Sequence, residues 1–439
     1  MKAATQYLQS HSTKDLLERV GQRVPDVACC DSTDKQFLPS SYGGGRPNDG
    51  GDFLAGHGLF YLTEEGRLFL DCTSGHYQML WGYNPPALCE AIHEAQQAGI
   101  VWDNHSNIPQ WPVKQLAQRL ETYANSAAGE DRLDKVLIGV CTGSSACAAA
   151  LKMQLSYYEH RRDGEGPPVF IVLEGNYHGT DMFAQRLRGM WRDYVTNIVV
   201  ATVEPNDIEE LHAIFERYGP RVAAFWAEPV MMNREAILVQ PEYLRVAREC
   251  CDSVGAAMCI DEIQTGFWQP RIFSSAEFDF TPDMIVVGKG MTAGFHPLSG
   301  LLFKSRYDLL EQYDALNTNG GAALASYVAL RSLDLVEAQA DRIAPLGERV
   351  MNGFRKLAEK HADLLVEARG HGYLAGLKFK RDKDALAFHQ RALENGIWIR
   401  AHAYHAGHSA ILTKLGMPAD ETIIDFLVER FDALLAQSR

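Results

Sequence analysis

The sequence predicts an α/β protein in which a large domain holds a mainly parallel sheet covered by helices, joined to a smaller α/β domain. Three observations support this prediction. Apolar runs alternate with amphipathic stretches from about residue 112, a second group of strand-like segments follows a long helical stretch after Leu324, and the 439 residues are 46% hydrophobic. Alternating strands and helices form parallel sheets with helices on both faces, and a chain of this composition can bury a large core.

Residues 1–75 are expected to form an N-terminal arm and a hairpin that join the small domain. A helix-like start precedes a segment dense in Gly, Pro, Ser and Asp, which we interpret as an extended arm. Its Gly43 to Gly45 run is typical of a flexible loop and not of a phosphate loop, because no strand precedes it and Pro47 follows. The segment GLFYLTEEGRLFLDCTSG alternates in hydrophobicity around Glu65 and Gly66, which predicts a hairpin.

Residues 76–330 are predicted to form the large domain and residues 331–439 the small one. The large domain's strands are expected at VLIGVC, VFIVLEG, IVVATV, AAFWAEPV, AAMCIDEI, MIVVGK and LSGLLF, with amphipathic stretches such as NDIEELHAIFERYG between them. The small domain is expected to contain VEARGHGYLAGLKF, a helix and NGIWIRAHAY. In a parallel sheet, ligands bind beyond the carboxyl ends of the strands.

Charge and cysteine usage disfavour several classes of protein. The formal net charge of −14 is spread along the chain, which argues against a surface for nucleic acid or an anionic membrane. The nine cysteines lack the spacing of a disulfide framework or a metal knuckle, so we expect reduced thiols and no metal. The stretch MKAATQYLQSHSTKDLLERV lacks the apolar core of a signal peptide, and no apolar run approaches about 18 residues. We therefore expect a cytoplasmic protein that binds neither nucleic acid nor membrane.

The segment TGSSA follows the first large-domain strand and opens an alanine-rich helix. Gly143 permits close approach of a ligand to the backbone, and Ser144 and Ser145 offer hydroxyls beside amides at the positive end of the helix dipole. These features fit a phosphate site. Ordinary capping of the helix by a serine is an equally good interpretation of this segment alone.

Two further strand ends carry residues that suit a flat, charged ligand. Tyr177 follows VFIVLEG and precedes a glycine, so its ring can cover an aromatic ligand, although a buried tyrosine is more often a core residue. Asp261 ends the apolar strand AAMCI, and Glu262 and Gln264 follow it. A buried carboxylate needs a compensating partner, either a structural cation or the protonated nitrogen of a ring that acts as an electron sink.

Lys289 ends the apolar run MIVVG and is flanked by Gly288 and Gly290, which leave room for a group on the lysine nitrogen. It follows Asp261 by 28 residues, so adjacent strand ends can present both side chains to one cleft. A desolvated lysine loses its proton readily and becomes a nucleophile, whereas a solvated lysine at a strand end has no such role. Together, the phosphate site at TGSSA, the ring of Tyr177, the buried Asp261 and the desolvated Lys289 describe a phosphorylated pyridine aldehyde bound as an imine.

With these motifs the chain resembles the class III aminotransferases, which are pyridoxal-phosphate enzymes of fold type I. The landmarks are TGSSA, YHG, the Glu228-Pro229 dipeptide, DEIQTGF, GKG, TNGGAALA at 318–325 and RGHGYLAG at 369–376. They occur in the family's order from about residue 56 to the C-terminus. The resemblance implies the fold type I architecture, pyridoxal 5′-phosphate as cofactor, and transfer of an amino group from an amine or amino-acid donor to a keto-acid or aldehyde acceptor.

The resemblance also implies roles for the residues around the cofactor ring. Lys289 would form the Schiff base with the cofactor and move the proton between the substrate and C4′. Asp261 would pair with the pyridinium nitrogen, and Gln264 would approach the phenolic oxygen. Tyr177 would stack on the ring with His178 beside it.

Further residues are implied at the cofactor phosphate and at a subunit interface. Gly143 and Ser144 would hold the phosphate, and Glu228 would belong to the cofactor-binding set. Thr318 would reach the phosphate of the neighbouring subunit's cofactor. The last role implies a homodimer with active sites at the interface between the subunits.

The sequence departs from the family pattern where substrates bind. Ser145 stands where Glu is usual, and NGGAALA after Thr318 lacks the usual aromatic residue and Asn-Pro. The stretch VMMNREAI after Pro229 looks like the corresponding segment of glutamate-1-semialdehyde aminomutases. Near the C-terminus, only Lys414 stands close to the position of an arginine that grips 2-oxoglutarate in many members. The sequence therefore leaves donor and acceptor open.

The segment HAYHAGH contains three histidines that no motif explains. His402, His405 and His408 would share one face only on a helix, and Gly407 together with strand-like IWIRA favours a loop, so we expect no metal site. Solvated loop residues are the default interpretation, and substrate binding by these histidines or by Arg400 is the alternative. By family position, His76 and Tyr77 would line the substrate pocket.

Two other functions stay open on sequence grounds. A pyridoxal-phosphate aminomutase, decarboxylase or lyase would use the same cofactor residues, and product analysis separates it from an aminotransferase. A non-catalytic binding protein on the same scaffold is disfavoured because Lys289, Asp261 and Gln264 are all present.

Overall fold

The computed structural model describes residues 1–25, 27, 38–39, 50–100, 108–126, 129, 131–161, 166–403 and 406–437. The chain divides into two compact units, one from Met1–Pro86 with Pro345–Arg439 and the other from Ala87–Ala344. The sequence placed its domain boundaries after residues 75 and 330. Most of the predicted arm, including Gly43 to Gly45, lies outside the described residues. Within the described part, no helix has the length and apolarity to span a bilayer.

The unit Ala87–Ala344 is built on a seven-stranded sheet with the order β4-β12-β11-β10-β7-β5-β6. Its strands are β4 (Lys135–Val140), β5 (Val169–Leu173), β6 (Val199–Val203), β7 (Val222–Ala227), β10 (Ala257–Asp261), β11 (Met284–Val287) and β12 (Ser299–Phe303). Neighbouring strands from β11 to β6 pair in parallel, whereas β12 runs antiparallel to β11 and β4. The predicted α/β class with a mainly parallel sheet is confirmed. The reversal of β12 was not predicted, because an apolar run does not reveal its direction.

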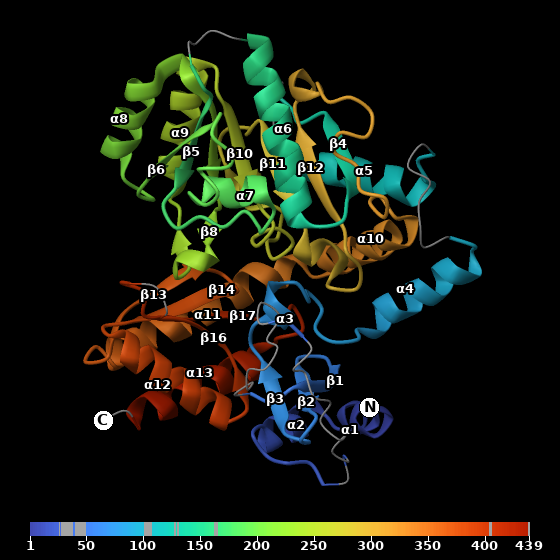
Figure 1. The fold of residues 1–439 in the computed structure, drawn as a ribbon. Helices are drawn as coiled ribbons and strands as arrows, with labels where there is room; N and C mark the ends of the chain where they lie inside the picture. The colour runs from blue at the N-terminus through green and yellow to red at the C-terminus, as the bar shows by residue number, and fades with distance from the viewer. Residues whose placement is uncertain are drawn as a thin grey trace. The chain divides into compact units, whose positions relative to one another are not determined.

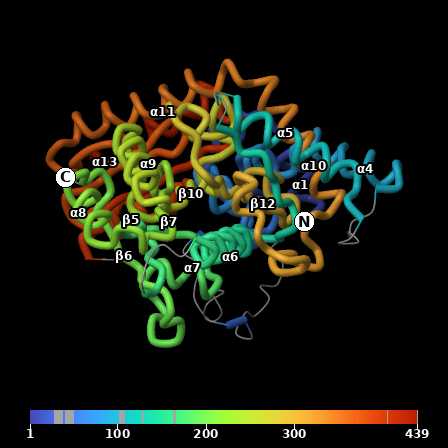
Figure 2. Tube along the Cα trace, turned by 90° about the horizontal axis from the view of Figure 1, so that it is seen from above, coloured from blue at the N-terminus to red at the C-terminus, as the bar shows by residue number. Residues whose placement is uncertain are grey.

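Helices cover both faces of this sheet because successive side chains of each strand point to opposite sides. Phe170 and Val172 pack in the same core cluster as α6 (Gly143–Arg161), whereas Ile171 and Leu173 pack in the cluster of α8 (Ile208–Tyr218) and α9 (Pro241–Val254). Figure 2 shows α6 and α9 on opposite sides of β7 and β10. The helices of the unit are α4 (Pro86–Gln97), α5 (Trp111–Ala124), α6, α7 (Met182–Leu187), α8 (Ile208–Tyr218), α9 (Pro241–Val254) and α10 (Ala323–Ala338), and β8 (Val230–Met231) and β9 (Ile237–Leu238) form a small ribbon.

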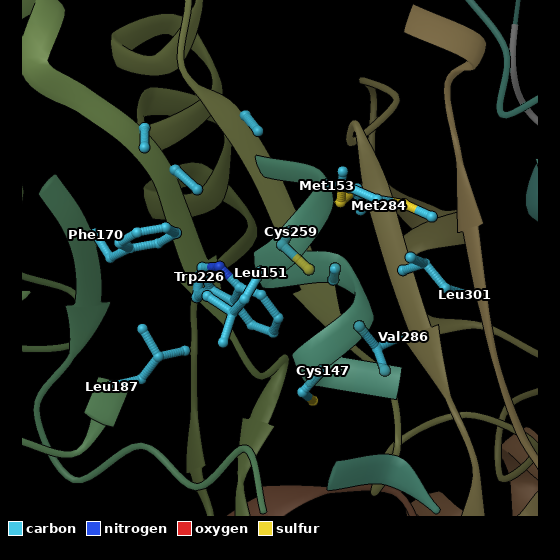
Figure 3. Packing of buried hydrophobic residues seen from close by; sticks show 14 of the residues in the cluster. Cys147, Leu151, Met153, Phe170, Leu187, Trp226, Cys259, Met284, Val286 and Leu301 are labelled. Carbon is cyan, nitrogen blue, oxygen red and sulfur yellow. The ribbon is translucent and has the colours of Figure 1, made fainter. Parts of the chain in front are cut away.

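Helix α6 lies close to the sheet because many of its buried residues are alanines. Figure 3 shows Cys147 and Leu151 of this helix near Trp226 and Val286 of the strands. The buried indole of Trp226 donates a hydrogen bond of 2.9 Å to Oε1 of Gln154 on α6, so its polar group is satisfied. This packing fixes the start of α6 against the sheet.

The unit formed by the two ends of the chain contains two four-stranded sheets (Figure 1). One has the order β1-β2-β3-β15, with β1 (Phe53–His57), β2 (Phe60–Thr63), β3 (Leu68–Asp71) and β15 (Ile397–Trp398). The other is antiparallel in the order β13-β14-β17-β16, with β13 (Leu365–His371), β14 (Leu374–Phe379), β16 (Arg400–His402) and β17 (Ala410–Lys414). Its helices are α1 (Lys2–Ser10), α2 (Thr13–Arg19), α3 (Ser74–Tyr77), α11 (Ala340–Lys360), α12 (Asp382–Glu394) and α13 (Glu421–Ala436).

Local sequence signals explain several of these elements. The predicted hairpin is formed by β2 and β3, and Gly66 in its turn has φ of +77°, a conformation that favours glycine. The predicted N-terminal helix is divided into α1 and α2 at Ser12, whose side chain and that of Asp15 form a capping box. The segment IWIRA supplies two strands, β15 and β16, one to each sheet.

Candidate active site

Two neighbouring strands end in the two residues on which the sequence prediction depends. Asp261 is the last residue of β10 and pairs in register with Val286 of β11, and Lys289 follows two residues after the end of β11. Lys289 is half-buried and has φ of +38°, an uncommon conformation for a residue with a side chain. Strained backbone of this kind clusters at functional sites. The parallel pairing therefore brings Asp261 and Lys289 to one edge of the sheet.

The glycines on either side of Lys289 are required by packing. A Cβ atom on Gly288 would lie 2.7 Å from Oγ of Ser299, and one on Gly290 would lie 2.5 Å from the ring of Trp268. The sequence interpretation, in which these glycines leave room for a group on the lysine nitrogen, is therefore wrong. Side chains of the protein already fill that space, and the glycines allow the turn to fit against them.

Asp261 is held by three groups of the protein. Nδ1 of His178 lies 2.7 Å from Oδ2, the amide of Ile263 donates to Oδ1 at 3.0 Å, and Sγ of Cys147 lies 3.8 Å from Oδ2. Asp261 and His178 are 3% and 1% exposed. Because a carboxylate accepts only, Nδ1 of His178 must carry the hydrogen. A carboxylate offers about four acceptor positions, so Asp261 can also accept from the N–H of a ligand ring.

The start of α6 is tied to the loop that carries Tyr177 and His178. The amide of Thr180 donates to Oγ of Ser144 at 3.0 Å, and a Cβ atom on Gly179 would lie 2.3 Å from the same oxygen. The helix is capped by Thr142, whose Oγ1 accepts from the amide of Ser145 at 3.2 Å. The serine cap that we considered from the sequence is therefore not the arrangement found. The first amides of α6 point out of the helix, as a phosphate site requires.

Glu228 joins the predicted residues Tyr177 and Gln264. Its Oε1 accepts from the amide of Tyr177 at 2.8 Å, and its Oε2 accepts from Nε2 of Gln264 at 3.2 Å. Burial raises the pKa of Glu228 to about 7, against a lowering influence of His178. The ring of Tyr177 is half-buried, and the guanidinium of Arg188 lies 5.0 Å from its centre.

Thr318 lies in an exposed loop between β12 and α10. The preceding Asn317 fixes this loop on the end of β4. Its backbone amide donates to the carbonyl of Gly139 at 2.8 Å, and its side-chain Oδ1 accepts from the backbone amide of Cys141 at 3.0 Å. The contact of Thr318 with a neighbouring subunit's cofactor stays a prediction, because the structure is of one chain.

The other candidate residues lie in the unit formed by the chain ends. Arg400 donates to Nδ1 of His76 at 2.7 Å and to Nε2 of His402 at 3.1 Å. His402 ends strand β16 and is buried, contrary to the loop predicted for it, whereas His405 lies outside the described residues. Lys414 is buried in β17 and donates to the carbonyl of Tyr77 at 3.2 Å. Their roles toward a substrate stay predictions.

Three contacts of the site were not predicted from the sequence. Thr180 reaches Ser144, Cys147 reaches Asp261, and Oδ1 of Asn233 lies 3.4 Å from Nε2 of Gln264. A sequence signal existed for Cys147 alone, because it lies four residues after Gly143 and so on the same face of a helix. The others depend on pairings between distant segments.

The arrangement fits a phosphorylated pyridine aldehyde. The Gly179 loop and the start of α6 leave backbone amides for a phosphate, with no space for a Cβ atom between them. The buried Asp261 suits a protonated ring nitrogen, and Nε2 of His178 is buried without a hydrogen-bond partner among the described residues. Lys289 supplies the amine for the aldehyde. Within the described residues, no group of three or more His, Cys, Asp or Glu side chains is placed to hold a metal ion.

Comparison with known proteins identifies relatives over most of the chain. The family model described as "Aminotransferase class-III" matches residues 52–412. An ornithine aminotransferase of Emericella nidulans is 27% identical over 347 residues, which cover 75% of this chain and 74% of that protein.

Solved structures with the same fold include three enzymes of low sequence identity. The ornithine aminotransferase from Toxoplasma gondii ME49 is 22% identical with a TM-score of 0.79, over 93% of this chain and 96% of that one. A Bacillus anthracis aminotransferase is 20% identical with a TM-score of 0.79, over 98% and 100%. A transaminase from the marine bacterium Virgibacillus is 21% identical with a TM-score of 0.77, over 88% and 92%. At these identities the likeness shows the fold.

Proposed function

The chain belongs to the class-III aminotransferase family, and we propose that Lys289, Asp261 and the start of α6 form its catalytic centre. It is a pyridoxal-phosphate-dependent aminotransferase that acts on small-molecule amine and keto substrates. The family match and the curated relative favour this activity over the aminomutase, decarboxylase or lyase alternatives. The observation that carries the assignment of residues is the position of Asp261 and Lys289 at the ends of two paired strands.

When bound, pyridoxal phosphate supplies an aldehyde that condenses with amines and a ring that accepts the electrons left by a departing α-proton. Asp261 holds a proton on the ring nitrogen, and this positive charge favours acceptance of those electrons. His178 keeps the carboxylate of Asp261 in place through the bond of 2.7 Å. We assign the amides of Gly143 and Ser144 to the phosphate and the ring of Tyr177 to one face of the cofactor.

Lys289 moves the proton. With the cofactor bound, its Nζ would take the proton from the α-carbon of the substrate and deliver it to the exocyclic C4′ carbon of the cofactor. The turn after β11 fixes the lysine backbone beside the strand end. We assign Gln264 to the phenolic oxygen, with Glu228 behind it.

We extend the proposal to assembly and location. The exposed loop of Thr318 supports a homodimer in which this residue serves the neighbouring subunit's site. A cytoplasmic location is supported by the cysteines of the described residues, all of which are free thiols. Light scattering after size exclusion checks the dimer, and a monomer with full activity would contradict it.

Borohydride labelling tests the assignment of Lys289. Purified protein that contains cofactor should absorb near the visible edge, and reduction should abolish this band and leave the cofactor covalently attached to the peptide that contains Lys289. Lys289→Ala should take up cofactor without the covalent label and lose turnover, while Lys114→Ala, at an exposed lysine of α5, should behave as wild type. Label on another lysine, or turnover by Lys289→Ala, would contradict the proposal.

A donor panel identifies the substrate class. Amino acids, ω-amines and amino sugars are added singly to loaded protein, and the cofactor band is followed without an acceptor. The correct donor converts the band in a single turnover, because the amino group stays on the cofactor until a keto substrate removes it.

A further inference from the structure

Glu228 and Gln264 share a hydrogen bond whose direction decides what the amide can offer to a ligand. Nε2 of Gln264 lies 3.2 Å from Oε2 of Glu228 and 3.4 Å from Oδ1 of Asn233. Two acceptors of the protein therefore take the two N–H hydrogens of this amide, the second of them weakly. Glu228 and Gln264 are 2% and 3% exposed, so their hydrogen bond is shielded from solvent and an unpaired donor or acceptor there would be costly.

On the basis of the proposed function, the positions of the substituents on pyridoxal phosphate indicate which cofactor group Gln264 binds. The aldehyde carbon lies opposite the ring nitrogen, between the phosphate arm and the phenolic oxygen. If Asp261 takes the nitrogen, Lys289 the aldehyde and the start of α6 the phosphate, the phenolic oxygen is the remaining polar group. Gln264 is three residues beyond Asp261, and its partner Glu228 interacts electrostatically with both Asp261 and Lys289.

The hydrogen-bond directions of the cofactor-free protein do not suit that oxygen. A phenolic oxygen that has lost its proton accepts hydrogen bonds and repels a nearby carboxylate. An ionised Glu228 both holds Nε2 of Gln264 and places a second negative charge nearby. A protonated Glu228 removes both conflicts. When the side-chain amide of Gln264 rotates so that Nε2 and Oε1 exchange places, the O–H of Glu228 donates to Oε1.

We propose that Glu228 is protonated when the cofactor is bound and donates to Oε1 of Gln264, so that Nε2 of Gln264 donates to the phenolic oxygen. Oε1 of Glu228 continues to accept from the amide of Tyr177, so Glu228 keeps two hydrogen bonds in either state. The half-buried Asn233 can turn its own amide to match. Glu228 is thus a positioning residue that acts on the cofactor through Gln264.

Near neutral pH, the surroundings of Glu228 allow its carboxylate to take up a proton at a small cost in free energy. Burial raises the pKa of Glu228 to about 7. Among its charged neighbours, His178 from the loop after β5 lowers it, Asp261 at the end of β10 raises it, and Lys289 after β11 lowers it. A carboxyl group in this balance accepts a proton for a small cost when a negatively charged oxygen arrives.

The first test compares cofactor affinity in wild type and Glu228→Gln across pH. The glutamine mimics the protonated acid, since its amide donates to Gln264 and its oxygen accepts from Tyr177. The ratio of the pyridoxal phosphate dissociation constants, wild type over variant, should be near unity at about pH 6 and rise about tenfold per pH unit above about pH 7, as linkage to one proton requires. Ionisation of the cofactor phosphate occurs with both proteins and cancels in the ratio. Glu216→Gln, at an exposed glutamate of α8, should match wild type throughout.

Infrared difference spectra give a second readout that needs no variant. Cofactor is added to the wild-type protein at about pH 8, which is above the pKa of Glu228 in the cofactor-free protein. This addition should produce a carboxylic-acid C=O band that shifts when the glutamates carry ¹³C. Glu228→Gln should lack the band.

Three results would overturn the inference. The affinity ratio would be flat or fall with pH, the acid band would be absent after loading, or Glu216→Gln would reproduce the pH dependence. If borohydride still labels Lys289 in such an experiment, the proposed function stands and only the proton on Glu228 is rejected. Protein that takes up no cofactor at all would overturn both.

Discussion

Nδ1 of His178 lies 2.7 Å from Oδ2 of Asp261, and both side chains are almost fully buried although 83 residues separate them in the chain. This bond holds the carboxylate at the end of β10 in one orientation. A buried carboxylate without such support would lie in an apolar setting at a cost of several kcal/mol. His178 therefore makes it possible for Asp261 to present a negative charge at the strand end.

Asp261→Asn should retain cofactor at Lys289 but lower the rate of donor conversion by about 100- to 1,000-fold. The amide has the size of the carboxylate and cannot hold a positive charge on the ring nitrogen. Single-turnover measurements at the cofactor band check this. His178→Gln should cause a smaller loss, because it removes the support and leaves the charge. An Asn variant as fast as wild type would show that another group serves the ring nitrogen.

Gly179→Ala should weaken cofactor binding by at least about tenfold, because the added Cβ lies 2.3 Å from Oγ of Ser144 and φ is +115°. The loop must then move away from the start of α6 and lose the bond from Thr180 to Ser144. Gly189→Ala is a matched control, since Gly189 also has positive φ, +77°, but no atom lies within 4 Å of its Cβ position. Dissociation constants from ultrafiltration measure both. Equal effects of the two substitutions would mean that backbone strain, not the contact with Ser144, is responsible.

Stability of the cofactor-free protein should fall as pH rises through the range in which Glu228 titrates. Burial raises the pKa of Glu228 from 4.5 to about 7, so the folded state binds its proton more tightly than the unfolded state does. Unfolding is therefore favoured progressively from about pH 4.5 to about pH 7, by up to about 3 kcal/mol. Glu228→Gln should remove this component. Thermal unfolding midpoints across pH measure it, and parallel curves for variant and wild type would contradict the raised pKa.

Asp283→Asn should destabilise the protein by about 3 to 5 kcal/mol, because buried cations would lose their counter-ion. Asp283 is 0% exposed and lies 2.6 Å from Arg248 and 3.2 Å from Lys304, with Arg306 also in contact. Urea unfolding measures the loss. Asp252→Asn is the control, since this exposed partner of Arg248 should contribute at most about 1 kcal/mol.

The same carboxylate should also contribute to acid sensitivity. Burial alone would raise the pKa of Asp283, but Arg248, Lys304 and Arg306 hold it below its ordinary value. Its contribution to stability is therefore complete above the ordinary pKa of 3.8 and is lost as pH falls below it. Asp283→Asn should flatten the acid limb of the stability curve, and an unchanged limb would contradict this assignment.

Individual residues show which features of the site can be predicted from the sequence. Asp261 and Lys289 were predicted at adjacent strand ends because apolar runs mark buried strands, and each run stops where its polar residue stands. The start of α6 was predicted because Gly and Ser residues follow a strand and open a helix. By contrast, nothing in AAMCIDEI or NYHG indicates that Asp261 and His178 form a hydrogen bond. The purpose of Gly288 was misjudged because the position of Ser299 depends on the antiparallel pairing of β12.

The sequence by itself determined the type of each element and the set of chemical groups, because side-chain periodicity and residue type are local properties of a chain. Only the tertiary structure decided the strand order, the direction of β12 and the partners of each buried polar group. Those partners lie 36 residues apart for Ser144 and Thr180 and 51 apart for Tyr177 and Glu228. Bonds across such separations depend on which strand ends the sheet brings together, and no local sequence pattern specifies that strand order.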